Sequence, residues 1–152
     1  MKVWVLGILM LGIGGGMAYA QGVVRPESPG ASGVVLAEPK VYRWEEMPVR
    51  RMPNGAESRD SLNGLMASGE TVSVHETVQP AGAPANPQHV IHHSEIITVL
   101  QGTVAFEHGA ATEKVGAGGV IYVATGTLHT LRNIGDGPAK YVVVAIGGDI
   151  RK

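Results

Sequence analysis

The stretch QHVIHHSEIITVLQG, residues 88–102, places three histidines and one glutamate immediately before an apolar segment that ends in glycine. Imidazole and carboxylate groups this close together are the usual ligands of a divalent metal site. Because side chains alternate between the two faces of an extended chain, His89 and His93 would share a face with Glu95. His92 would point to the other face. The alternative interpretation is a polar loop with solvated histidines that leads into a strand.

A second stretch, GGVIYVATGTLHTLRN at residues 118–133, begins with a tight turn and continues as an apolar strand. A Thr-Gly turn then leads to a single histidine, His129, on another short strand. His129 is distant in sequence from the first cluster, so it can join that cluster only if the fold brings the two strands together.

Together, the two stretches resemble the paired motifs of the cupin superfamily over residues 69–147. The positions that match in order and spacing are His89, Glu95 and Gly102 in the first motif and Gly118, Gly126, His129 and Asn133 in the second. The resemblance implies an all-β fold, a small single-domain jelly-roll (double-stranded β-helix) barrel. It also implies that Gly102, Gly118, Gly126 and Asn133 are structural turn residues.

The resemblance further implies that His89, Glu95 and His129 bind one divalent metal ion. Two imidazoles and one carboxylate with open positions suit iron or manganese, and zinc or nickel would also accept these ligands. Such an ion can polarise a substrate oxygen or activate water or dioxygen.

The chain departs from the family pattern at Ile91, where the family has the second histidine ligand of the first motif. If the strand is regular here, His93 has the parity to replace that ligand as a fourth one. If a bulge intervenes, His92 takes this role instead. Gly119 and Ala124 stand where aspartate and proline are common in the family, and both departures affect turns.

Residues 1–20 have a basic start, an apolar run and Ala-Tyr-Ala before Gln21, the pattern of a secretory signal peptide cut after Ala20. A membrane anchor is the alternative, but glycines interrupt the apolar run, which falls short of the roughly 20 residues that a span needs. We therefore expect a secreted or periplasmic protein without a stable membrane span. The chain has no cysteine, so its core must form without disulfides.

The remaining chain divides by composition into three parts. Residues 21–39 are rich in Gly, Pro, Ser and Ala and predict a flexible lead-in, and residues 69–152 predict the barrel. Between them, residues 40–68 predict an N-terminal arm with edge strands. Residues 40–48 would form an edge strand or a docked extended segment. Turns are expected at Asn54-Gly55 and Asn63-Gly64.

Short strands separated by Gly and Pro, without a helical period, independently favour an all-β sandwich or barrel. The strands are expected at residues 70–79, 95–102, 103–108, 112–115, 120–124, 128–133 and 139–146. The strand at 95–102 is apolar on both faces. One face would line the barrel, and the other would be covered by the arm or by a second subunit, which predicts a homodimer.

Charge restricts the partners. Removal of Lys2 with the leader lowers the formal net charge from −1 to about −2, and no basic run remains, so nucleic acid is not expected as a partner. No motif position supplies an arginine or lysine to the barrel interior, which favours a neutral, apolar or phenolic small molecule.

The leading hypothesis is a metal-dependent enzyme of the dioxygenase, isomerase, decarboxylase or lyase type. The alternative is a non-catalytic cupin that binds a ligand or metal or serves as an interaction module.

Overall fold

The computed structural model describes residues 34–148 and 150, so the expected signal peptide lies outside the described residues. The described chain is all-β with one short 3₁₀ turn. Its elements are β1 (Val35–Leu36), η1 (Trp44–Glu46), β2 (Val49–Arg51), β3 (Glu57–Met66), β4 (Thr71–Gln79), β5 (His89–Val90), β6 (Ser94–Gln101), β7 (Thr103–His108), β8 (Ala111–Gly116), β9 (Val120–Val123), β10 (Leu128–Asn133) and β11 (Ala139–Ile146). No helix in these residues is long and apolar enough to cross a membrane.

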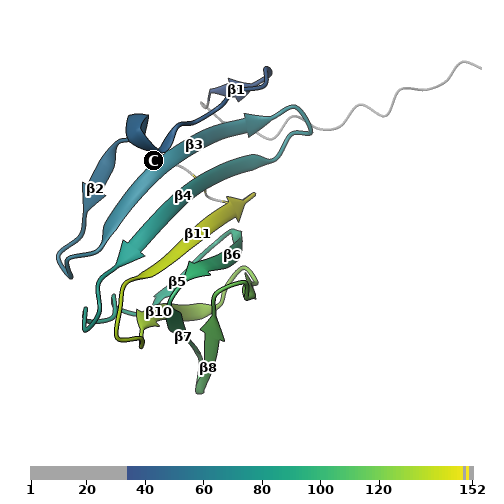
Figure 1. Ribbon diagram of the computed structural model, residues 1–152. Coiled ribbons are helices and arrows are strands. Elements are labelled where there is room, and N and C mark those ends of the chain that lie inside the picture. The colour runs from purple at the N-terminus through teal and green to yellow at the C-terminus, as the bar shows by residue number, and fades with distance from the viewer. Residues whose placement is uncertain (1–33, 149, 151–152) are drawn as a thin grey trace, which may run out of the picture.

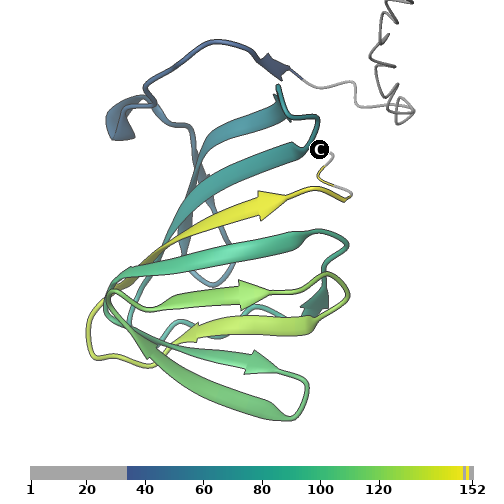
Figure 2. The ribbon, with the colours of Figure 1, turned by 90° about the vertical axis from the view of Figure 1, so that its right-hand side faces the viewer.

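The strands form two sheets in a jelly-roll arrangement (Figures 1 and 2). The larger sheet has the order β1-β3-β4-β11-β6-β9, with β2 also paired to β3, and the smaller sheet has the order β5-β10-β7-β8. The long strands β3, β4 and β11 run side by side, and the smaller sheet lies below them in Figure 1. The hydrogen bonding of each sheet stops at that sheet's own edge strands. The two sheets face each other as a sandwich and enclose the core between them.

Alternation of side chains along the strands builds this core. In β11, Tyr141, Val143 and Ala145 are buried while the residues between them are partly exposed. In β6, Ile97 and Val99 point inward. The apolar cluster contains Ile91, Ile97, Val99, Val104, Phe106, Ile121, Val123, Leu131, Ala139, Tyr141 and Val143. The two-residue period read from the sequence therefore identifies the inner face of the sandwich.

The N-terminal arm joins the larger sheet as β2 and β3. The expected turn at Asn54-Gly55 is confirmed: Gly55 has φ 81° and its N–H donates to the Met52 carbonyl. The expected turn at Asn63-Gly64 is wrong, because both residues lie inside β3, where pairing with β4 overrides the local turn preference. Gly64 instead allows β1 to approach, since a Cβ there would collide with the Val34 carbonyl oxygen.

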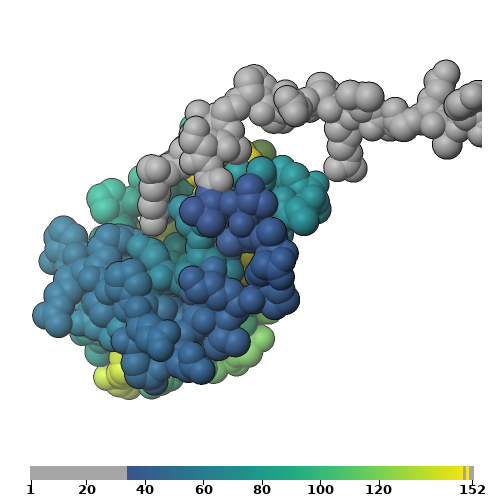
Figure 3. All heavy atoms as spheres, turned by 90° about the horizontal axis from the view of Figure 1, so that it is seen from above, coloured from purple at the N-terminus to yellow at the C-terminus, as the bar shows by residue number. Residues whose placement is uncertain are grey.

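Residues 40–48 contain no strand, which corrects the expectation of an edge strand there and leaves a docked segment. The turn η1 carries Trp44, whose ring contacts two cations. The Arg59 guanidinium is 4.2 Å and the Lys140 ammonium 4.3 Å from the ring centre. These cation–π contacts hold the segment against the larger sheet. In Figure 3, the N-terminal part of the described chain covers much of the face in view.

The glycines expected at turns adopt the left-handed conformation. Gly102, Gly118 and Gly126 have φ values of 74°, 85° and 81°. At Gly102 the space is also restricted, because a Cβ would lie 2.7 Å from the Pro138 carbonyl oxygen. Both constraints exclude a larger residue between β6 and β7.

Asn133, at the end of β10, connects three segments. Its side-chain N–H groups donate to the carbonyls of Gln79 (3.0 Å) and Gly137 (2.8 Å), and its side-chain oxygen accepts from the Gly135 N–H at 2.9 Å. Its backbone N–H donates to the Gln79 side chain at 2.7 Å. Asn133 thereby closes the β10–β11 turn and ties it to the end of β4.

We predict that Asn133→Ala lowers the free energy of unfolding by about 2–4 kcal/mol, because it leaves buried backbone groups without partners. Urea denaturation monitored by circular dichroism measures this loss. Asn63→Ala, at an exposed position in β3, is the matched control and should change stability by less than about 0.5 kcal/mol. Equal stability of the two variants would contradict the assigned role of Asn133.

Candidate metal centre

Two histidines are brought together by the pairing of β5 with β10. In this antiparallel ladder His129 is directly opposite His89, and their ring centres are 4.7 Å apart. Directly paired residues on adjacent strands project to the same face of the sheet. The two sequence motifs therefore meet within the smaller sheet.

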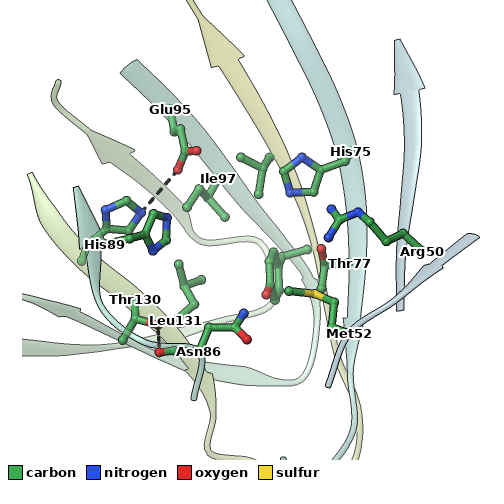
Figure 4. Close-up of a pocket in the computed structure, with 13 residues that line it drawn as sticks. Arg50, Met52, His75, Thr77, Asn86, His89, Glu95, Ile97, Thr130 and Leu131 are labelled. Atoms are coloured by element: carbon green, nitrogen blue, oxygen red, sulfur yellow. Dashed lines mark hydrogen bonds and ion pairs between the residues drawn. The ribbon is translucent and has the colours of Figure 1, made fainter. Parts of the chain in front are cut away.

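Glu95 enters the same cluster from the larger sheet, because the chain crosses from one sheet to the other between β5 and β6. The Glu95 carboxylate is 3.4 Å from His129 Nε2 and 3.1 Å from His93 Nε2, one oxygen facing each ring. Figure 4 shows the Glu95 carboxylate facing an imidazole on one side of the pocket. All four residues predicted as ligands (His89, His93, Glu95 and His129) thus lie in one region.

The donor set fits a divalent ion in chemical type and nearly in spacing. Ligands that bind at 2.0–2.2 Å around one ion lie about 3.0–3.5 Å from each other, which is the range of the Glu95–imidazole distances. As they stand, no three His, Cys, Asp or Glu side chains in the described part of the chain converge on one point.

Hydrogen bonds and charges set the protonation of the cluster. Burial opposes ionisation of Glu95, but the hydrogen bonds to His129 and His93 and their charges lower the pKa of this carboxyl below its usual value. Burial likewise opposes a charged His129, whereas its bonds to Glu95 and to the Thr127 carbonyl raise the pKa of this imidazole. A proton on Nδ1, donated to the Thr127 carbonyl at 3.2 Å, directs Nε2 toward Glu95.

The structure also shows where the remaining residues of the first motif lie. His92 is exposed, and residues 92–93 form a bend instead of a regular strand. His93 nevertheless lies beside Glu95. Ile91 is 5% exposed and packs into the apolar core, and its carbonyl accepts the Gly126 N–H at 2.8 Å. The place of the family histidine is therefore filled by an apolar side chain.

The loop before His89 is anchored from both sides. Thr130 Oγ1 donates to the Asn86 carbonyl at 2.9 Å, and Asn54 donates to the Pro84 carbonyl and to the Asn86 side chain. The β2–β3 turn of the arm and strand β10 of the smaller sheet together position the loop that carries His89.

His89, Glu95 and His129 line a cavity of about 180 Å³, which we call the central pocket. Its wall includes the apolar side chains of Ile97, Leu131 and Val143. It also includes Tyr141, for which burial, opposed by a hydrogen bond with Thr77 and assisted by the Glu95 charge, raises the pKa to about 12. The phenol therefore stays protonated at neutral pH.

Sequence reasoning missed one residue of the central pocket. Arg50, from β2, lines it together with Met52, whereas we expected no basic side chain in the interior. The expectation considered only positions within the two motifs, and β2 lies outside both. A signal did exist in the sequence, since Arg50 and Arg51 adjoin in the arm, but nothing in their spacing indicates which one faces the pocket.

The chain is similar to known cupins. The family model described as cupin domain (Cupin_2) matches residues 74–145. An RmlC-like cupin from Shewanella frigidimarina is 12% identical, with a TM-score of 0.61 over 74% of this chain and 94% of that one. A predicted oxalate decarboxylase from Thermotoga maritima is 20% identical, with a TM-score of 0.55 over 70% and 98%. The polyketide cyclase RemF from Streptomyces resistomycificus is 16% identical, with a TM-score of 0.57 over 76% and 88%.

No curated protein matches this chain in sequence. The family match spans both motifs, from β4 to β11, and contains every residue predicted as a metal ligand. The solved structures agree with it in fold. Residues 74–145 of this chain therefore form a cupin domain.

Proposed function

We propose that this protein is a metal-dependent cupin enzyme that acts on a small molecule in the central pocket. The observation that carries the proposal is that the Glu95 carboxylate contacts both His93 and His129, and that His129 in turn contacts the His89 ring at the pocket wall. The fold is shared with proteins described as a predicted oxalate decarboxylase, an oxalate oxidase and a polyketide cyclase. The cupin fold is thus compatible with enzymes, and the donor cluster supplies the chemistry.

His89, Glu95 and His129 would hold the ion, with His93 in place as a fourth ligand. A bound iron or manganese ion would supply Lewis acidity toward a substrate oxygen or activation of water or dioxygen. Zinc or nickel would accept the same donors. The protein's own groups orient this site: the Thr127 carbonyl directs His129, and the protonated Tyr141 presents a hydrogen-bond donor at the pocket wall.

The second candidate is a non-catalytic cupin that binds a ligand or a metal, or serves as an interaction module. It is favoured by Ile91, which packs in the core where the family places a histidine. The two candidates differ in whether an ion is bound stoichiometrically with open positions.

We predict that the protein, purified without added ions, contains about one iron or manganese per chain, measured by plasma mass spectrometry. After chelation, Mn²⁺ binding is followed by calorimetry. His129→Ala should abolish Mn²⁺ binding. This loss exceeds the roughly 10–100-fold drop in metal affinity expected when a residue that only hydrogen-bonds to a ligand is removed. His92→Ala is the matched control and should bind as the wild type does. His93→Ala discriminates between a three-ligand and a four-ligand site.

A wild type that binds no ion, or histidine variants that all retain Mn²⁺ equally, would contradict the metal-dependent function. If the protein contains stoichiometric zinc and no iron or manganese, the proposed site stands, but its metal is zinc. Thermal unfolding of each variant shows whether the substitution has altered the fold instead of the site.

We further propose that the mature protein is an exported homodimer. On the outer face of β6 and β9, Ile96 pairs with Tyr122, and Val120 is adjacent. Tyr122 and Val120 are 66% and 63% exposed, and Leu100 extends the apolar face. A face of this kind favours association with a second copy of the chain.

Protein recovered from the exported fraction is predicted to begin at Gln21 and to scatter light as a dimer. Intact mass and multi-angle light scattering measure both properties. Tyr122→Glu should give a folded monomer, because it places a charge within the proposed interface at a position that tolerates polarity in the monomer. Retention of Met1, or a monomeric wild type at micromolar concentration, would contradict the respective part of the proposal.

A further inference from the structure

The N-terminal arm carries four arginines with different surroundings, Arg43, Arg50, Arg51 and Arg59. The Arg43 guanidinium lies 4.0 Å from the Glu46 carboxylate. Arg51 forms an ion pair with Glu57 at 3.3 Å. Arg59 stacks on Trp44 and donates to a backbone carbonyl. The Arg51 and Arg59 guanidinium groups therefore have a role in holding the arm.

Arg50 differs from the other three. It lies opposite Ser58 in the β2–β3 ladder, and its Nη2 is 3.3 Å from the Ser58 hydroxyl. Ser58 is almost completely buried, so this contact directs the guanidinium toward the central pocket, which Arg50 lines from an exposed position on β2. Within the described residues, Arg50 forms no ion pair. A guanidinium has five N–H donors in a planar fork, and the contact with Ser58 occupies only part of them.

The charge of Arg50 is not neutralised by the acidic residue of the pocket. The Glu95 carboxylate is directed toward His93 and His129. In Figure 4, Arg50 lies on the opposite side of the pocket from Glu95 and His89. The two ends of the pocket therefore have different chemistry: a cationic fork at one end and the donor cluster at the other.

The space between the two ends limits the ligand. The cavity of about 180 Å³ slightly exceeds the engineered cavity of about 150 Å³ that accommodates benzene. Apolar side chains of Ile97, Leu131 and Val143 contribute to its wall. A ligand that fits has a compact apolar body and a charged group small enough to reach the guanidinium.

We propose that the central pocket selects a small carboxylate, with Arg50 binding the carboxylate and the apolar body extending toward the donor cluster. An arginine fork matches the two oxygens of a carboxylate with parallel hydrogen bonds. The part of this inference that places the apolar body of the ligand near the donor cluster rests on the proposed function. The binding of the carboxylate by Arg50 does not. It assigns substrate recognition to an arm strand outside the matched cupin domain, residues 74–145.

The test uses the full mature protein, first free of metal, with benzoate and its neutral counterpart benzamide as probes. Binding is measured by NMR titration. Arg50→Gln should weaken benzoate binding by about 10- to 100-fold, the effect of one charge-assisted bidentate contact. Arg51→Gln, on the adjacent and highly exposed residue, is the matched control and should bind as the wild type does. Arg50→Lys should restore part of the affinity.

Three outcomes would overturn the inference. In the first, Arg50→Gln binds benzoate as tightly as the wild type does. In the second, the wild type binds benzamide and benzoate with equal affinity. In the third, the wild type binds no benzoate up to about 10 mM, where the binding free energy is already very small. Tighter binding of phenyl phosphate than of benzoate would also overturn the choice of carboxylate.

Mn²⁺ titration of the same variants separates this inference from the proposed function. If the wild type binds no Mn²⁺ but prefers benzoate through Arg50, the metal-dependent function fails and the recognition stands. If Mn²⁺ binds and the preference for benzoate is absent, the recognition alone fails. Arg50→Gln should bind Mn²⁺ as the wild type does, since Arg50 lies away from the donor cluster.

Discussion

A carboxylate enclosed between two β-sheets must be compensated, and the compensation of Glu95 links the two halves of this molecule. Glu95 projects from the larger sheet and faces His129 of the smaller sheet. An isolated buried charge is costly, and it is tolerated where hydrogen bonds and opposite charges stabilise it. The contact that stabilises the Glu95 charge also places a carboxylate beside an imidazole, the ligand types that divalent ions bind. The inner face therefore contains polar groups as well as apolar packing.

Much of the fold follows from the local pattern of the sequence. The strands at 103–108, 128–133 and 139–146 have the expected bounds, because alternation and flanking turn residues act together there. Local pattern fails where tertiary contacts decide. Asn63-Gly64 has turn chemistry but lies in the middle of β3, since pairing with β4 on one side and close approach of β1 on the other require an extended chain with no side chain at residue 64.

The sequence predicted the donor residues of the candidate site but not every residue that lines it. The spacing of the motifs identified His89, Glu95 and His129, and the structure brings them into one region. Parity predicted that His93 shares a face with Glu95, and the His93 ring lies beside Glu95 although the chain bends at residues 92–93. The sequence could not indicate that Arg50, and not Arg51, faces the pocket, because the direction of each side chain depends on the pairing of β2 with β3.

Ile91 connects these observations. Its side chain packs into the apolar core and its carbonyl accepts the Gly126 N–H, so the backbone near the two motifs is retained although a donor has been replaced. If His93 does not bind the ion, three protein ligands would leave it more positions for substrate or water, and it would depend more on other contacts to orient a ligand. A fixed cation at the far end of the pocket supplies such a contact without crowding the donor cluster. The presence of Ile91 beside the donor cluster and of Arg50 at the far end of the pocket is therefore consistent with the proposed site, which binds its ligand at two points.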